Sequence, residues 1–327
     1  MAAFEPLVMS AAGYGLAVAL GLLWGSFANV CIYRWPAGRS VIAPGSHCVA
    51  CQAPIRWYDN VPVLAWLWLR GRCRACQAPF SARYLVVEAV TGALFGVAWW
   101  DAVVAAAPFA PLDLRLLHFA IYAAFCLVMV VIAVIDLDHK LILNRVTVPS
   151  LAAFYLASLA WPERHWYDGI VGAAVGYGVP WAIGEIYYRV RRLEAMGLGD
   201  SMLLAVVGAL LGWRGVVVVL FLGSVIGTLI VVPAALVAWR RGDAVDPDAV
   251  DPDAVDPDAV DPKAQDAAGG PPAADPAAQS TADPAAQDDT PSLLHTEVPF
   301  GTFLAMAAVL YLLAEPWIQI HFDLPGG

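Results

Sequence analysis

Runs of apolar residues constrain the fold of this chain more than any other feature. A helix that crosses a bilayer needs about 20 mostly apolar residues, and the sequence holds eight runs near or below that length. They lie at Leu7–Val30, Tyr84–Trp100, Leu114–Ile135, Val146–Trp161, Gly169–Tyr187, Met202–Trp213, Val216–Trp239 and Phe300–Ile320. Because 60% of the 327 residues are hydrophobic and only 14% are charged, an ordinary soluble globule is excluded. We therefore predict an all-α polytopic membrane protein with about eight transmembrane helices.

The acidity of the chain is confined to one segment. The formal net charge is −10, yet residues 243–292 hold thirteen Asp and one Lys, which leaves +2 for the rest. This segment repeats Ala-Val-Asp-Pro-Asp from Ala244 and contains no aromatic residue. It cannot bury enough apolar surface to fold. We predict a disordered acidic insert between the last two spans.

Basic residues collect in the loops at one end of the predicted bundle. The loop 31–83 alone holds seven arginines, and three further connections on the same side hold seven more Lys or Arg residues. Short loops rich in Lys and Arg stay in the cytoplasm. With eight spans, all of these loops share one side of the membrane, which we therefore predict to be cytoplasmic.

Four of the six cysteines form two Cys-x-x-Cys pairs in the first cytoplasmic loop. Cys48 pairs with Cys51, and Cys73 pairs with Cys76 after 21 intervening residues. Two such pairs are typical of a closed, tetrahedral four-thiolate zinc site. Two disulfides are the alternative, which a reducing cytoplasm disfavours. We predict a small zinc-binding loop domain in which the metal is structural, because the loop has little core of its own.

Two aspartates stand at the ends of apolar runs on the same predicted side. Asp136 closes the third run, and Asp200 ends the Gly-Leu-Gly-Asp segment before the short sixth run. A carboxylate at membrane depth is costly and by default marks a functional site. Two carboxylates held close together cannot both ionise, so one keeps a proton while the other activates a water molecule. We predict that Asp136 and Asp200 form a catalytic pair.

These acids have two other interpretations. Asp200 could simply cap the helix that follows it. Asp138 also lies near the end of the third run, but residues two apart on a helix point to different faces, so only one of Asp136 and Asp138 can face Asp200. We interpret Asp138 as a solvated surface acid.

Taken together, these motifs resemble the type IV prepilin peptidase family, and the resemblance covers nearly the whole chain outside the acidic insert. The segments that carry it are Gly25–Val30, Tyr33–Pro36, Trp57–Pro62, Leu69–Gly71, Ser81–Tyr84, Val87-Glu88, Thr91-Gly92, Ile135-Asp136, Glu194–Asp200 and Val298–Gly301, together with the two cysteine pairs.

The resemblance implies an aspartyl endopeptidase of the bacterial inner membrane. It would cut the basic leader from type IV prepilins or type II secretion pseudopilins at the cytoplasmic face. It would also methylate the new N-terminal residue with S-adenosylmethionine, an activity associated in this family with the cysteine-bearing domain. The resemblance assigns Asp136 and Asp200 as the catalytic pair and the four cysteines as zinc ligands. No Gly-rich segment indicates where S-adenosylmethionine binds.

Two positions depart from the family's usual pattern. Leu143 stands where Pro is usual, and Met202 stands where Lys is usual. The second departure removes a cation near Asp200 and puts the pH optimum or the rate in question. As partners we expect pilin substrates and membrane lipid, and no nucleic acid.

The expected organisation has five parts. They are residues 1–30, the first transmembrane helix; 31–83, the cytoplasmic four-cysteine domain; 84–242, the peptidase core; 243–292, the acidic insert; and 293–327, the last helix and C-terminus.

Two other functions stay open. One is a zinc-stabilised transporter with Asp136 and Asp200 as a proton relay, although both acids lie at the predicted membrane edge and no inverted repeat is visible. The other is a non-catalytic secretion assembly protein, which the Met202 departure favours.

Overall fold

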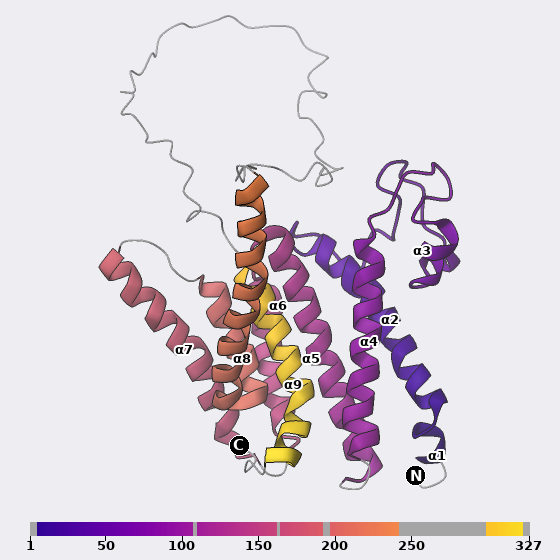
Figure 1. Ribbon diagram of the computed structural model, residues 1–327. Helices are drawn as coiled ribbons and strands as arrows, with labels where there is room; N and C mark the ends of the chain where they lie inside the picture. Colours follow the sequence, from indigo (N-terminus) through magenta and orange to yellow (C-terminus); the bar gives the residue numbers. More distant parts are fainter. Residues whose placement is uncertain (1–4, 107–109, 162–163, 192–196, 242–298, 323–327) are drawn as a thin grey trace, which may run out of the picture.

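The computed structural model describes residues 5–106, 110–161, 164–191, 197–241 and 299–322. Within these ranges the regular structure is helical and no β-sheet forms, so the predicted all-α class is confirmed. The helices are α1 (Glu5–Val8), α2 (Ala11–Arg34), α3 (Leu64–Leu69), α4 (Arg83–Trp99), α5 (Leu112–His139), α6 (Asn144–Ser158), α7 (Trp166–Arg191), α8 (Leu198–Arg241) and α9 (Phe300–Phe322) (Figure 1). A 3₁₀ helix, Trp57–Asn60, precedes α3, and a π-helix, Trp100–Ala105, continues α4. The predicted insert 243–292 lies outside the described residues.

The predicted count of eight spans is not confirmed. Among the described residues, five helices are long and apolar enough to cross a bilayer: α2, α4 with its π-helical extension, α5, α7 and α8. α6 has only 15 residues and contains Pro149. α9 has 23 residues and is apolar over Phe300–Glu315. The first predicted run is also broken at Ser10, whose hydroxyl accepts the Ala12 N–H and so caps α2.

The long helix α8 contains both the sixth and the seventh predicted runs. Gly212 interrupts it with φ 73° and ψ 178°, a backbone conformation that is almost confined to glycine. A Cβ on Gly208 would lie 2.9 Å from the Val216 side chain, although eight residues of straight helix would separate the two positions by about 12 Å. The chain therefore turns back at Gly212, and the two halves are drawn in salmon and orange in Figure 1.

Protein surrounds the first half of α8. Most of its side chains from Leu203 to Leu210 are at most 2% exposed, and α6, α7 and α9 pack against α8. The contact with α7 is close, because a Cβ on Gly172 would lie 2.1 Å from the Gly208 carbonyl oxygen. Small residues permit such approaches between membrane helices. The predicted short helix is thus enclosed in the bundle, with Asp200 in its first turn.

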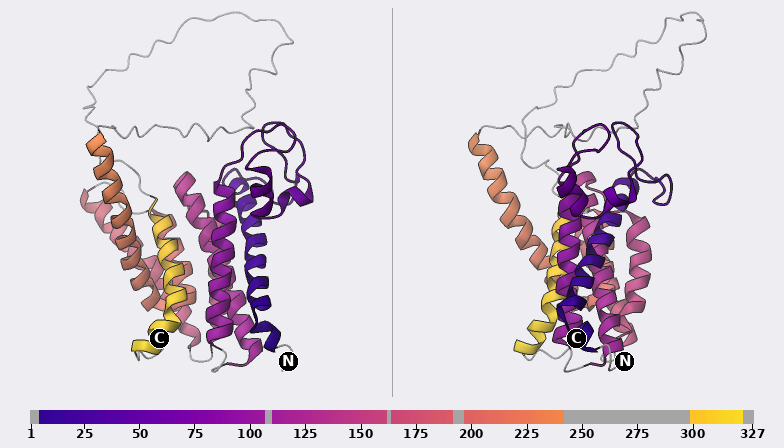
Figure 2. Two further views of the ribbon diagram at one scale, coloured as in Figure 1. Left: turned by 45° about the vertical axis from the view of Figure 1, so that its right-hand side comes forward. Right: turned by 90° about the vertical axis from the view of Figure 1, so that its right-hand side faces the viewer.

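The candidate functional residues gather at one end of the bundle. α2 and α5 end there, α4 and α9 begin there, and the segment between α2 and α4 stands over the ends of those two helices (Figure 1, Figure 2). Just inside this end, buried side chains of α2, α4 and α5 form what we call the α2–α4–α5 cluster: Ala28, Cys31, Ile32, Val87, Val130, Val131 and Ile135. This cluster holds the three helix ends together.

Candidate functional site

The two cysteine pairs lie in a repeated heptapeptide. Residues 48–54 and 73–79 both read Cys-x-Ala-Cys-Gln-Ala-Pro, and both make the same turn. Cys48 and Cys73 each donate their backbone N–H to the carbonyl oxygen five residues later, at 2.9 and 2.8 Å. Gln52 and Gln77 take positive φ angles of 57° and 62°. The repeat beyond the cysteines was visible in the sequence, but its structural meaning was missed.

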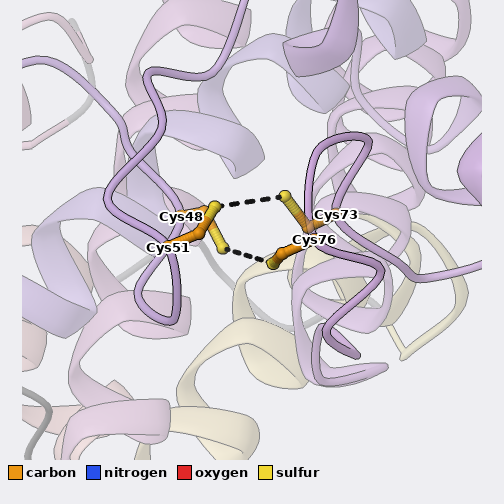
Figure 3. A group of neighbouring side chains, drawn as sticks. All are labelled: Cys48, Cys51, Cys73 and Cys76. Atoms are coloured by element: carbon orange, nitrogen blue, oxygen red, sulfur yellow. Dashed lines mark hydrogen bonds between the residues drawn. The ribbon is translucent and has the colours of Figure 1, made fainter.

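The four sulfur atoms of these turns face one another (Figure 3). All lie within 4.8 Å of each other, with 3.8 Å between the Sγ atoms of Cys48 and Cys76 and 4.0 Å between those of Cys51 and Cys73. Tetrahedral zinc with Zn–S bonds of about 2.3 Å holds its sulfurs about 3.8 Å apart. A disulfide bond would need a distance of about 2.05 Å between two sulfur atoms. The spacing therefore fits zinc and does not fit the disulfide alternative.

The turn around Cys73 prepares a thiolate. Backbone hydrogen bonds, from Cys76 first and then from Ala75, lower the pKa of Cys73 to about 7. Because zinc binds the thiolate and not the thiol, this backbone arrangement favours metal binding near neutral pH.

Asp136 is held at the point where α5 meets the start of α9. Only 5% of the residue is exposed. Its Oδ2 atom accepts the Thr302 N–H at 2.6 Å and lies 3.0 Å from the Thr302 hydroxyl oxygen. N–H groups in the first turn of a helix have no partner inside the helix and favour a negative charge. Thr302 was missed by the sequence analysis, since no local pattern links it to Asp136.

Asp200 lies in the first turn of α8 and is half-buried. Its carboxylate accepts a hydrogen bond from the Gly197 backbone N–H, so the helix-capping role is present. The negative charge of Asp136 also acts on Asp200. The structure thus brings the two predicted acids into electrostatic contact, although 64 residues separate them in the chain.

Two glycines let the helix starts approach the turn after Asp136. A Cβ on Gly199 would lie 2.9 Å from Ile142 Cβ, and one on Gly301 would lie 2.7 Å from Ile142 Cδ1 and 3.0 Å from Asp136 Oδ2. α8 and α9 therefore both contact Ile142. These contacts bring the ends that carry Asp200 and Thr302 close to the end of α5.

Asp138 and Leu143 near this site have structural explanations, and nothing in the structure explains Met202. Asp138 forms an ion pair with Arg83 at the start of α4, so its interpretation as a merely solvated acid was incomplete. Leu143 has φ −81° and ψ 121°, which proline could also adopt, so the turn forms without the family's usual proline. Met202 is partly buried.

A cavity of about 320 Å³ lies between the cysteine-bearing loops and the ends of α2 and α4. Glu88 of α4 lines it, is 8% exposed, and accepts the Val63 N–H at 2.7 Å and the Ser26 hydroxyl. Val63 has φ 62°, a strained conformation that costs about 1–3 kcal/mol for such a residue. Asn29 joins α2 to α4 through its bond to the Tyr84 carbonyl oxygen at 3.1 Å. The sequence did not predict this cavity.

Comparison with protein families defines the class of the chain. Residues 19–102 match the bacterial peptidase A24 N-terminal domain, and residues 123–232 match the type IV leader peptidase family. The first match includes most of α2 and all of α4, and the second includes Asp136 and Asp200. The fold therefore carries the two domains of a membrane leader peptidase.

Curated relatives agree with this class. A protein of Myxococcus xanthus named prepilin leader peptidase/N-methyltransferase is 32% identical over 92% of this chain and 90% of its own length. Proteins of the same name from Aeromonas hydrophila and Klebsiella pneumoniae are 35% and 36% identical, over 65% and 62% of this chain and 78% and 87% of their own lengths. No solved structure matches the chain. The chain belongs to the type IV prepilin leader peptidase family, and it is an enzyme.

Proposed function

We propose that this enzyme is an aspartyl endopeptidase that removes the leader peptide of type IV prepilins or type II secretion pseudopilins, with Asp136 and Asp200 as its catalytic pair. One observation carries this proposal. Two acids from distant helices, one buried against the start of α9, interact electrostatically at the same end of the bundle. A buried pair of like charges is the arrangement that lets one carboxyl keep its proton while the other accepts one.

The hydrogen bonds suggest which acid takes which role. Asp136 receives the Thr302 N–H and lies beside the Thr302 hydroxyl, whereas a single backbone N–H contacts Asp200. Since donors favour the charged form, Asp136 is the base that takes a proton from the attacking water. Asp200 keeps its proton and gives it to the carbonyl oxygen as the tetrahedral intermediate forms. Asp136 then gives the proton it took from water to the leaving nitrogen, and the carbonyl oxygen returns its proton to Asp200 as the carbon–nitrogen bond breaks.

The site operates at the cytoplasmic face in this proposal. Residues 31–83, with their seven arginines, lie at the end of the bundle where α5 ends and α8 begins, and these helix ends carry Asp136 and Asp200. The positive-inside rule assigns such loops to the cytoplasm. A pilin whose hydrophobic segment lies in the membrane would present its leader on this side.

The second activity is N-methylation of the cleaved pilin by S-adenosylmethionine, supported by the names of the curated relatives. Cys48, Cys51, Cys73 and Cys76 hold zinc in a structural role. A site with four sulfur ligands is closed, so the metal would order the loops that cover the cavity and would not act on substrate.

The decisive experiment uses the full-length protein in lipid nanodiscs with a model prepilin whose basic leader ends in Gly before Phe. Asp136→Asn and Asp200→Asn should each lower cleavage by about a hundredfold or more, as measured by mass spectrometry. Asp138→Asn is the matched control and should stay within about fivefold of wild type, because it removes only a partly exposed ion pair.

The same spectra test the alternatives. A product heavier by one methyl group reveals the transferase. If wild type cleaves nothing while it still supports pilus assembly, the non-catalytic assembly protein replaces the peptidase.

A further inference from the structure

A group of exposed aromatic and apolar side chains lies around the short helix α3. Trp57 and Trp68 are 82% and 83% exposed. Leu64, Leu67 and Trp68 share one face of α3, because residues three and four apart on a helix are neighbours. The ring of Tyr58 packs edge-on against Trp57, and Tyr58 lines an open groove of about 450 Å³ with Leu64 and Trp68. These five side chains form one patch, which we call the α3 surface.

A hydrogen bond sets the height of α3 against the bundle. The Val63 N–H, just before α3, donates to the buried Glu88 carboxylate at 2.7 Å. Glu88 lies five residues after Arg83, where α4 begins, which is about 7.5 Å along the helix. The start of α3 is therefore held beside the first two turns of α4, and Figure 1 shows α3 at the height where α4 begins. Val63 keeps its φ of 62° here, a strained conformation that persists only where surrounding contacts fix it.

Lipid surrounds the bundle at this height. α4 and its π-helical extension together have 23 residues, which make about 34 Å of helix, close to the roughly 30 Å hydrocarbon core of a bilayer. The first turns of α4 therefore lie where the hydrocarbon meets the headgroups. Val86, in this part of α4, is 55% exposed, as expected of a side chain that faces lipid. The α3 surface thus faces the outer part of a lipid leaflet and not bulk water.

The residue types around α3 suit the boundary between lipid tails and headgroups. Trp and Tyr are enriched there, because each has an apolar ring and one polar atom. In water, a contiguous apolar patch of this kind would instead favour aggregation. Two exposed arginines flank the α3 surface, Arg56 directly before Trp57 and Arg70 directly after α3. Positive side chains at this depth attract anionic lipid headgroups.

We propose that the α3 surface is a second membrane contact of the enzyme, inserted into the lipid leaflet beside α4. Trp57 and Trp68 lie at the boundary of the lipid tails, and the two flanking arginines contact anionic headgroups. Glu88 holds α3 from the bundle side while lipid holds it from outside, so the loops that carry the cysteines keep a fixed height at the helix ends. The proposal does not depend on which reaction the enzyme catalyses.

The depth of Trp68 can be measured by fluorescence on the full-length protein in nanodiscs. The chain has 13 Trp residues, so the emission of one is obtained as the difference between wild type and its Phe variant. Trp68→Phe and Trp66→Phe are the matched pair, because Trp66 lies on the same helix but lines the cavity and has its Nε1 atom buried. Lipid brominated near the headgroup end of its tails should quench about half or more of the Trp68 emission. The Trp66 emission should change little, and aqueous acrylamide should quench Trp68 only weakly.

Two results would overturn the proposal. Quenching of Trp68 by acrylamide but not by brominated lipid would place the α3 surface in water. Protection of Trp68 from both quenchers would show that protein covers the surface, as in a contact between two copies of the chain. Melting temperatures equal to that of wild type show that both Phe variants are folded.

The headgroup contact is tested by titrating the detergent-solubilised protein with brominated lipid and following the Trp68 emission. With phosphatidylglycerol, the Arg56→Gln/Arg70→Gln variant should need a higher lipid concentration for half-quenching, by about fivefold for each arginine removed. Brominated phosphatidylcholine, whose headgroup has no net charge, is the matched control and should quench both proteins alike. Equal half-quenching concentrations with phosphatidylglycerol would overturn the assignment of these arginines to anionic headgroups.

Discussion

The hydroxyl group of Thr302 supports Asp136, and its removal should weaken peptide cleavage without unfolding the site. Thr302→Val keeps the size of the side chain and the backbone N–H bond of 2.6 Å, but removes the hydroxyl 3.0 Å from Asp136 Oδ2. A hydrogen bond to a charged group contributes about 1.5–3 kcal/mol, or about 10- to 150-fold in rate. The hydroxyl has one proton and a second acceptor, the Ala133 carbonyl oxygen at 2.9 Å. We therefore expect the cleavage rate to fall by about tenfold, the lower end of this range.

The assay is steady-state cleavage of the model prepilin by the variant in nanodiscs. Thr302→Ser is the matched control and should cleave near the wild-type rate, because it restores the hydroxyl. Equal rates for Thr302→Val and wild type would refute the idea that this side chain stabilises the charge on Asp136. A loss in Thr302→Ser alone would instead point to packing of the threonine methyl group, which valine keeps and serine lacks.

Three further predictions concern the glycine contacts, the metal and the loop domain. Gly301→Ala should lower cleavage by about tenfold or more, because its Cβ would lie within 3.0 Å of Ile142 and Asp136. Gly178→Ala is the control and should not lower cleavage, because its Cβ would have no atom within 4 Å. Both variants are measured in the cleavage assay, and equal rates would contradict the packing argument. Cys48→Ser should contain less zinc, as measured by elemental analysis, and should lose methylation. Cleavage should persist, because Asp136 and Asp200 lie on other helices. Full zinc retention would contradict the assignment of Cys48 as a ligand. Arg74 lowers the pKa of Asp59, so this pair stabilises the loop domain above the ordinary Asp pKa of about 3.9 and loses that contribution as pH falls through the lower folded pKa. Thermal melts of wild type and Asp59→Asn should therefore differ at pH 7 and converge at acid pH, and a constant difference would show that the charge is irrelevant.

The grouping of the four cysteines could be predicted from the sequence because its information is local. Each Cys-x-x-Cys turn positions two sulfurs through bonds within a few residues, as the repeated hydrogen bonds of Cys48 and Cys73 show. The helical class followed equally from the apolar runs. The number of spans is not confirmed, because α6 has only 15 residues, whereas the turn at Gly212 lies next to the boundary between the sixth and seventh predicted runs.

The parts that escaped prediction depend on distant contacts. Thr302 meets Asp136 across 166 positions of chain, and Glu88 meets the Val63 N–H across 25. No periodicity in the sequence encodes such a pair, because each residue fits its own helix or turn equally well whether or not its partner is present. Asp138 was similarly interpreted without its partner Arg83, 55 residues earlier.

The enclosed first half of α8 has a consequence for how the enzyme responds to its membrane. Because α6, α7 and α9 pack against α8 and the side chains from Leu203 to Leu210 are buried, the height of Asp200 is set by protein contacts and not by the thickness of the bilayer. Side chains such as Ile186 of α7 and Phe221 in the second half of α8 are exposed on the outside of the bundle, so thicker or thinner lipid would tilt the packed helices together. The distance between the Asp136 and Asp200 carboxylates would stay the same, so the geometry of the proposed catalytic pair would not change with its surroundings.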